Sequence, residues 1–305
     1  MKAALWYSRN DIRVEDVPEP EVKPGDVKIK VKWCGICGSD IHEYLDGPIA
    51  IPTTENHPLS GKKAPVILGH ELSGEVIEVG EGVEKLRIGD RVVLEPLVMC
   101  GKCPACLEGH YNLCKNIGFH GLCGTGGGFS EVTTYPERFV HKIPDSISYE
   151  KASLIEPFAV AIHSLKVGDF SIGQNAVVIG AGPIGLATIE TLKTAGAGIV
   201  IAVQRKSMRQ DYAKKAGADY VLDPDEVEIP AEVKKILGEG ADIVFEVSGT
   251  KAGFNEGIKS LKYAGLFGYI LFKVRKDFLK SVQIFERGLE MYLFIYFFSK
   301  SPAYL

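Results

Sequence analysis

The sequence lacks the features of membrane proteins and of proteins that bind nucleic acid through charge. No apolar run approaches the ~20 residues that a membrane helix requires, and the mean hydropathy is only +0.06. Basic residues are not in excess, because 35 Lys and Arg stand against 39 Asp and Glu and give a formal net charge of −4. Residues 1–11 alternate like a strand and lack the pattern of a signal peptide. We therefore expect a cytoplasmic protein that binds neither a membrane nor a nucleic acid.

Apolar residues, by contrast, are plentiful. Hydrophobic residues make up 46% and charged residues 24% of the chain, which are the proportions of an ordinary globular protein. A length of 305 residues predicts about two domains at roughly 150 residues each. The 34 glycines indicate tight turns and close approaches of the backbone.

The first half of the chain is rich in short strand patterns. Residues 27–33, 72–79 and 91–94 alternate between apolar and polar side chains, which is typical of half-buried strands. Glycine, proline and aspartate separate these segments. The pattern predicts a mostly β, barrel-like domain over residues 1–150. Residues 43–64 contain three prolines and are expected to form a long surface loop.

The second half alternates apolar strands with helices. Helices are expected at 149–166, 183–195 and 208–216. The predicted strands are 176–179, 199–203, 220–222, 243–247 and 266–271. Strands that are apolar nearly throughout and alternate with helices are typical of a doubly wound parallel sheet. We expect this α/β domain to cover residues 151–305.

A glycine-rich motif follows the first of these strands and precedes a helix. Gly180, Gly182 and Gly185 occupy the three fixed positions of G-x-G-x-x-G, and Pro183 and Ile184 lie between the last two. The first glycine permits the tight turn, the second lets the backbone approach a pyrophosphate, and the third allows close packing of helix and strand. The N-terminus of the following helix adds partial positive charge for the anion. The motif predicts a Rossmann site for a dinucleotide.

The residue that would contact the ribose of this dinucleotide is not acidic. An aspartate or glutamate is usual about 20 positions after the motif, where it binds the 2′-hydroxyl. Here Gln204 stands 19 positions after Gly185, and Arg205 and Arg209 follow it. Cations without a carboxylate favour the 2′-phosphate of NADP over NAD. The alternative is a solvated, basic start of the next helix.

Four of the seven cysteines are closely spaced. They are Cys100, Cys103, Cys106 and Cys114. Four thiolates at short spacing on one loop can close a tetrahedral shell, which predicts a structural zinc site. An iron–sulfur cluster is a weaker alternative, and disulfides are not expected in a reducing compartment.

A second metal site is predicted from segments that are far apart in the sequence. Cys37, His70 and one carboxylate, Glu71 or Glu156, can bind a divalent ion and leave a fourth position for substrate. Cys37 also forms a C-x-x-C pair with Cys34, which can indicate redox chemistry. We do not favour that interpretation, because the sequence shows no helix start after the pair as in thioredoxin-like motifs.

These motifs together resemble the zinc-dependent medium-chain alcohol and polyol dehydrogenases, and the butanediol dehydrogenase branch in particular. The matching stretches are KVKWCGICGSDIHEYLDGP, APVILGHELSGEVIEVG, GDRVVLEP, CGKCPAC, YNLC, GGFSEV, LIEPFAVAIH and VIGAGPIGL. They cover about residues 1–270. The resemblance implies a GroES-like catalytic domain followed by a Rossmann domain.

The resemblance also implies roles for individual residues. Cys37, His70 and either Glu71 or Glu156 would bind a catalytic zinc. Asp40 would orient the ligating histidine, Ser39 would contact the substrate oxygen, and His42 would end the proton relay. The four closely spaced cysteines, Cys100, Cys103, Cys106 and Cys114, would bind structural zinc in a lobe at about residues 96–116. Two zinc ions are therefore expected per chain.

The implied reaction is hydride transfer between NAD(P) and a vicinal diol or α-hydroxyketone, such as 2,3-butanediol and acetoin. Alternatives are a sorbitol- or threonine-type dehydrogenase, an inactive truncated homologue, and a zinc module that binds nucleic acid. The resemblance further implies a homo-oligomer, if the C-terminal edge of the sheet is intact.

The C-terminal part departs from the family pattern. The resemblance fades after about Leu271, and we expect a shortened, atypical tail from about residue 272. Residues 291–298 read MYLFIYFF, which predicts either a sixth, edge strand or an exposed segment prone to aggregation.

Overall fold

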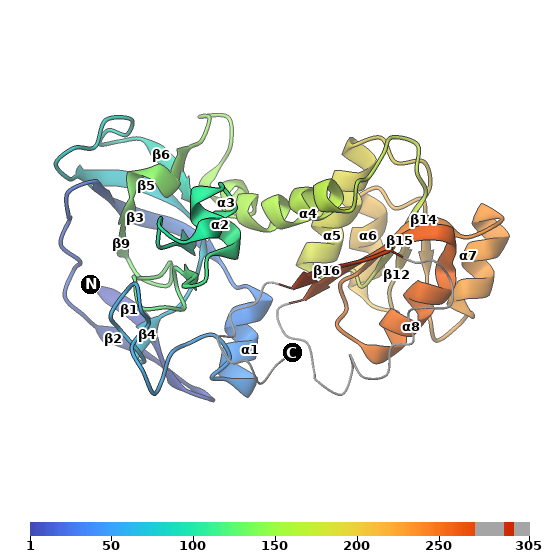
Figure 1. Cartoon of the computed structure of the whole chain (residues 1–305), viewed down its shortest axis with the longest axis horizontal. Coiled ribbons are helices and arrows are strands. Elements are labelled where there is room, and N and C mark those ends of the chain that lie inside the picture. The colour runs from blue at the N-terminus through green and yellow to red at the C-terminus, as the bar shows by residue number, and fades with distance from the viewer. Residues whose placement is uncertain (272–289, 296–305) are drawn as a thin grey trace. The chain divides into compact units, whose positions relative to one another are not determined.

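The computed structural model describes residues 1–271 and 290–295 (Figure 1). The chain forms two compact units, one ending at Glu156 and the other beginning at Pro157. This division falls a few residues beyond the boundary predicted at 150. Within the described residues, no helix combines the length and apolar character needed to cross a bilayer.

The first unit is mostly β, as expected. Its five-stranded antiparallel sheet has the order β10-β6-β5-β3-β9. These strands are β3 (Asp26–Gly35), β5 (Glu71–Val79), β6 (Arg91–Leu94), β9 (Val132–Pro136) and β10 (Val140–Lys142). The smaller sheets contain β1 (Lys2–Ser8), β2 (Asp11–Asp16) and β4 (Val66–Ile67), and β7 (Leu97–Val98) and β8 (Gly118–Phe119).

Alternation along β3 explains the packing of this unit. Val27 and Ile29 are fully buried, while the lysines between and after them are at least partly exposed. The two apolar residues pack with Leu72 and Val76 of β5 in one hydrophobic cluster. The period of two therefore brings one face of the strand into the core, as the sequence predicts.

The predicted loop at 43–64 is wrong over its first four residues. Helix α1 (Gly38–Asp46) continues through them. Glu43 is fully buried, and its carboxylate accepts the backbone N–H groups of Ile49 at 2.9 Å, Ile51 at 3.1 Å and also Ala50. The Glu43 side chain on α1 thus holds the start of the loop that follows the helix. The other helices of this unit are α2 (Pro104–Leu107) and α3 (Tyr149–Ala152), with 3-10 turns η1 (Tyr111–Leu113) and η2 (Glu137–Phe139).

The second unit contains the predicted parallel sheet. Its order is β13-β12-β11-β14-β15-β16, and every neighbouring pair is parallel. The strands are β11 (Ala176–Ile179), β12 (Val200–Val203), β13 (Tyr220–Leu222), β14 (Ala241–Glu246), β15 (Leu261–Leu271) and β16 (Glu290–Ile295). The order reverses between β11 and β14, which is where a doubly wound sheet binds dinucleotides.

Helices cover both faces of this sheet. On one face of β11, Ala176 and Val178 pack with Ile189 of α5. On the other face, Val177 and Ile179 belong to a second cluster with residues of α7 and α8. The alternation along β11 explains why a continuously apolar strand is required: both of its faces are buried. The helices are α4 (Ile155–Val167), α5 (Pro183–Thr194), α6 (Met208–Lys215), α7 (Ile229–Leu237) and α8 (Lys251–Ser260).

The aromatic run near the C-terminus contributes an edge strand. The backbone of β16 pairs with β15 in parallel, so the first of the two alternatives, a sixth strand at the edge, is present over residues 290–295. The remainder of the tail that we expect to be atypical, residues 272–289 and 296–305, lies outside the described part of the chain.

Gly185 provides a test of this packing. A Cβ atom added there would lie 1.9 Å from the carbonyl oxygen of Gly180, so Gly185→Ala must displace backbone. We expect the free energy of unfolding to fall by about 2 kcal/mol, the usual cost of overpacking, as measured by urea denaturation. Gly182→Ala is the control, because its Cβ would meet nothing within 4 Å. Equal stability of the two variants would contradict the prediction.

Candidate functional site

The junction between β3 and α1 positions the first group of candidate residues. Cys37 is the N-cap of α1, and its backbone N–H donates to Asp40 Oδ2 at 3.0 Å. Ser39 and Asp40 are consequently buried in the first turn, at 5% and 3% exposure. A helix therefore does start at the second cysteine of the C-x-x-C pair, and our reason for rejecting a redox motif was wrong.

Three candidate metal ligands converge in this unit. One ligand atom each of Cys37, His70 and Glu71 lies within 4.8 Å of the other two. His70 directly precedes β5 and Glu71 begins it. The Cβ of any other residue at Gly35 would come within 2.2 Å of Glu71 Oε2, so this glycine makes room for the carboxylate. Thiol, imidazole and carboxylate are the donors that suit zinc.

His70 has a polar group near each of its two ring nitrogens. It is 2% exposed, and its Nε2 lies 3.2 Å from Ser39 Oγ. Its Nδ1 lies 3.7 Å from Asp40 Oδ1, and these two are buried atoms without a hydrogen-bond partner among the described residues. Phe119 packs edge-on against the ring, with 5.0 Å between ring centroids. Burial lowers the pKa of His70 to about 4, so the imidazole is neutral and can act as a ligand.

The acidic groups around His70 destabilise one another. Burial, together with the charges of Glu71 and Asp40, raises the pKa of Glu156 to about 8. Burial raises the pKa of Asp40 to about 7, and it also raises the pKa of Glu71. Buried like charges are costly unless a cation compensates them. The donor set therefore fits a divalent metal.

Glu156 is near this group but outside it. It lies in the first turn of α4, and the three atoms that approach within 4.8 Å belong to Cys37, His70 and Glu71. Glu71 is therefore the better placed of the two carboxylates that the sequence leaves open.

His42 lies further along α1. Its side chain is 48% exposed, and its Nδ1 is 3.8 Å from Asp46 Oδ2. It follows buried Ser39 by three positions, so the two side chains lie on the same side of the helix. A buried hydroxyl and a half-exposed imidazole are therefore one turn apart on this side.

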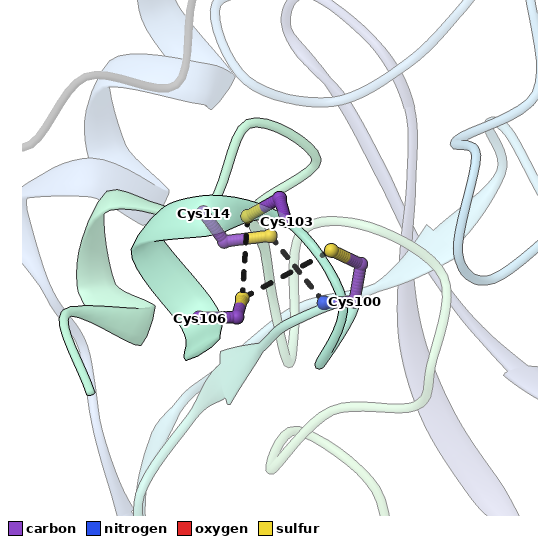
Figure 2. A group of neighbouring side chains, drawn as sticks. All are labelled: Cys100, Cys103, Cys106 and Cys114. Atoms are coloured by element: carbon purple, nitrogen blue, oxygen red, sulfur yellow. Dashed lines mark hydrogen bonds between the residues drawn. The ribbon is translucent and has the colours of Figure 1, made fainter. Parts of the chain in front are cut away.

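The four closely spaced cysteines also come together, as Figure 2 shows. The sulfurs of Cys103 and Cys106 are 3.5 Å apart, and those of Cys100 and Cys106 are 3.9 Å apart. Zinc–sulfur bonds of about 2.3 Å in a tetrahedron place sulfurs about 3.7 Å apart. All seven cysteines of the chain are described, and none forms a disulfide. The cluster fits a closed, structural metal site.

The glycine-rich turn has the backbone that the motif predicts. Gly180 has φ +101°, a conformation that side chains disfavour. Gly182 caps α5 with its backbone alone, and Pro183 and Ile184 form the start of that helix. A Cβ at Gly182 would meet open space, so no protein neighbour requires a glycine there. A ligand that lies against the backbone does require one.

The side chain of Gln204, at the position expected to face the cofactor ribose, forms hydrogen bonds with the protein backbone. Its Oε1 accepts the N–H of Ala181 at 2.8 Å, and its Nε2 donates to the carbonyl of Arg205 at 3.1 Å. The side chain thus ties the end of β12 to the glycine-rich turn. Arg205 is exposed and lies 3.5 Å from Asp225, and Arg209 is exposed on α6.

Sequence reasoning missed two residues of these sites. Phe119 packs on His70 from β8, and nothing in its sequence neighbourhood predicts that contact. Glu246 is fully buried at the end of β14; an acid directly after the apolar residues 243–245 was the available signal.

Comparison with known proteins identifies the family. The profile of the alcohol dehydrogenase GroES-like domain matches residues 23–145, and that of the zinc-binding dehydrogenases matches residues 183–298. The chain is 48% identical to (R,R)-butanediol dehydrogenase of Bacillus subtilis over 266 residues, which are 87% of this chain and 75% of that one. It is 38% identical to sorbitol dehydrogenase of the same organism, over 87% of this chain and 73% of that one.

A solved structure agrees with these similarities. The crystal structure of 2R,3R-butanediol dehydrogenase from Bacillus subtilis matches 97% of this chain and 84% of its own, with a TM-score of 0.86 and 43% identity. The chain therefore belongs to the zinc-binding alcohol dehydrogenase family. It is an NAD(P)-dependent oxidoreductase with a GroES-like and a Rossmann domain. The resemblance drawn from the sequence motifs is confirmed.

The open space at Gly182 leads to a prediction about cofactor binding. Gly182→Ala should weaken the binding of reduced nicotinamide cofactor by about tenfold or more, because the methyl group enters the space that the pyrophosphate requires. The dissociation constant is measured by cofactor fluorescence. The melting temperature should stay that of the wild type; unchanged affinity would show that no ligand lies against this residue.

Proposed function

We propose that the protein transfers a hydride between NAD(P) and a vicinal diol or α-hydroxyketone, with 2,3-butanediol and acetoin as the expected pair. The observation that carries the proposal is the convergence of Cys37, His70 and Glu71 in a chain 48% identical to (R,R)-butanediol dehydrogenases. Sorbitol dehydrogenase of Bacillus subtilis is less similar, at 38% identity, and a sorbitol-type activity is the second candidate.

The catalytic zinc would be held by Cys37, His70 and Glu71. When bound, zinc polarises the substrate oxygen and lowers the pKa of its hydroxyl. Asp40 Oδ1, at 3.7 Å from His70 Nδ1, favours the tautomer with its proton on Nδ1 and leaves Nε2 free as the ligand. Asp40 thus orients the ring and fixes its protonation.

The proton of the substrate hydroxyl needs a route to solvent. Ser39 Oγ lies 3.2 Å from the ligating nitrogen of His70, so its hydroxyl can contact a substrate oxygen bound there. His42, half exposed one turn later, exchanges the proton with water. Ser39 and His42 are therefore the inner and outer ends of the relay.

Two carboxyl groups compete for one ligand position, and this favours diols. Glu71 belongs to the group of converging ligands, and Glu156 interacts with it through charge. The carboxyl group that does not bind the metal is available to hydrogen-bond the second oxygen of a vicinal diol. A monohydric alcohol would leave that buried group unsatisfied.

The cofactor preference and the second metal complete the proposal. We assign NADP as the preferred cofactor because position 204 carries no acid and two arginines, Arg205 and Arg209, are exposed beside it. We assign a structural zinc to the four clustered cysteines, which gives two zinc ions per chain. Homo-oligomer formation and a cytoplasmic location stay predictions.

A substrate panel tests the function. Purified protein is incubated with acetoin and with NADPH or NADH side by side, and oxidation of 2,3-butanediol, sorbitol and threonine is measured in parallel. We expect acetoin reduction, faster with NADPH. Turnover of sorbitol alone would select the second candidate. Binding of NADPH without turnover of any substrate would identify an inactive homologue.

Substitution of a metal ligand tests the catalytic site. Cys37→Ala and His70→Ala should each lower kcat by about a thousandfold or more, because several kcal/mol of charge stabilisation is lost. Zinc measured by elemental analysis should fall from about two to about one per chain. Cys34→Ala is the matched control, since that thiol is outside the converging ligands. Retained activity in the Cys37 variant would refute the zinc site.

A charge at position 204 tests the cofactor preference. Gln204→Glu keeps the acceptor for Ala181 N–H but adds a negative charge near the ribose. We expect the NADP/NAD ratio of kcat/KM to fall about tenfold or more. Gln174→Glu is the control, because Gln174 Oε1 likewise accepts a backbone N–H, from Ser171 at 2.9 Å. An unchanged ratio in the Gln204 variant would contradict the charge argument.

A further inference from the structure

Glu246 is a buried acid that the reaction described above does not use. It is the last residue of β14 and fully buried, whereas Ser248, Gly249 and Thr250, which begin two positions later, are exposed. Its carboxylate accepts the backbone N–H of Ser248 at 2.9 Å and of Gly249 at 3.2 Å. It also accepts the hydroxyl of Ser248. One buried side chain therefore holds the exposed loop that follows the strand.

The same hydrogen bonds extend to the next helix. Ser248 Oγ lies 2.9 Å from Thr250 Oγ1, and that oxygen caps α8 by accepting the N–H of Gly253 at 3.0 Å. A Cβ at Gly253 would lie 2.9 Å from Glu246 Oε1, so the helix has a glycine where it passes over the carboxylate. The negative charge lies beneath the positive end of the helix dipole. The loop 247–250 and the start of α8 are thus joined through one network of hydrogen bonds.

This loop packs against the glycine-rich turn. Val247 N–H donates to the carbonyl of Ile179 at 3.0 Å. A Cβ at Gly180 would lie 3.1 Å from the backbone of Ser248. The two segments follow β11 and β14, the strands between which the sheet order reverses. They therefore lie at the carboxyl ends of the two strands beside the crevice in which a doubly wound sheet usually binds its dinucleotide.

A carboxylate at this place needs an explanation. Burial raises the pKa of Glu246 to about 7, even though its hydrogen bonds act in the opposite direction. An apolar residue would avoid the cost of burying a charge. What only a carboxylate supplies is two acceptor oxygens for donors that all belong to one loop.

We propose that Glu246 is a positioning residue for the nicotinamide dinucleotide, which it serves by fixing residues 247–250 beside the turn 180–182. Glu246 does not itself touch the cofactor. The proposal rests on the nicotinamide-dependent activity of the family and adds a residue to which the motif assigns no role.

Removal of one acceptor tests the proposal. Glu246→Gln keeps one oxygen but brings an amide NH₂ against a backbone N–H of the loop. The dissociation constants of NADPH and NADH are measured by cofactor fluorescence on the zinc-loaded protein. We expect both to rise about tenfold, the effect of losing a charged hydrogen bond. The zinc content and the KM for acetoin should stay unchanged, which separates this role from an effect on the metal site.

Asp242 provides a matched control at the other end of the same strand. It accepts the N–H of Asn175 at 2.7 Å and pairs with Lys262. Asp242→Asn therefore makes the same chemical change in β14, away from the crevice. We expect it to lower the melting temperature and to leave both dissociation constants unchanged. Equal losses of affinity in the two variants would overturn the proposal, because general loosening of the sheet would then explain them.

Ser248→Ala is a second variant that tests the same role of Glu246, in case Glu246→Gln does not fold. The residue is exposed, and its hydroxyl is one of the donors to the carboxylate. We expect a smaller rise of about threefold in both dissociation constants, because the backbone N–H groups of Ser248 and Gly249 still donate to the carboxylate. Wild-type affinity in either folded variant would overturn the role of Glu246. Failure of the wild-type protein to bind either cofactor would overturn the proposed function as well.

Discussion

The structure depends first on the burial of acidic and thiol groups around one imidazole. Asp40, Glu71 and Glu156 all have raised pKa values, and burial also raises the pKa of the Cys37 thiol. Such a cluster is unfavourable alone, because each charge lacks solvent and repels its neighbours. A divalent cation reverses this balance, since it turns repelling groups into shared ligands. The β-sheet and α1 are then the frame that holds those ligands in place.

The second unit differs, because its glycine-rich turn leaves the backbone accessible to a charged ligand. Its key positions are glycines and helix ends rather than reactive side chains. Side chains have a supporting function there: Gln204 ties β12 to the turn after β11, and Glu246 ties the loop after β14 to the start of α8. The converging thiol, imidazole and carboxylate are thus in one unit, and the glycine-rich turn is in the other.

Much of this could be predicted from the sequence, because the elements follow simple periodicities. The alternation in 27–33 and the apolar run in 176–179 predicted β3 and β11, and the motif spacing predicted both cysteine-containing sites. The start of α1 was missed because its N-cap is Cys37 and not the usual Ser, Thr, Asp or Asn. The inward bonding of Gln204 and the burial of Glu246 depend on contacts between segments that are distant in the chain. Local patterns do not contain that information.

The carboxylate of Glu43 has a consequence for how this enzyme could diversify. It anchors three consecutive amides at the beginning of the long loop, while Ser39 and Asp40 occupy the preceding turn of the same helix. The beginning of the loop is therefore attached to α1 at a buried carboxylate. Later in the loop a second attachment holds it to the chain around β8, because Ser60 Oγ donates to the carbonyl of Cys123 and His57 Nε2 lies 3.1 Å from the carbonyl oxygen of Ile117. Insertions are therefore tolerated best between these two attachments, at the exposed residues 53–56, where they leave the turn with Ser39 and Asp40 in place.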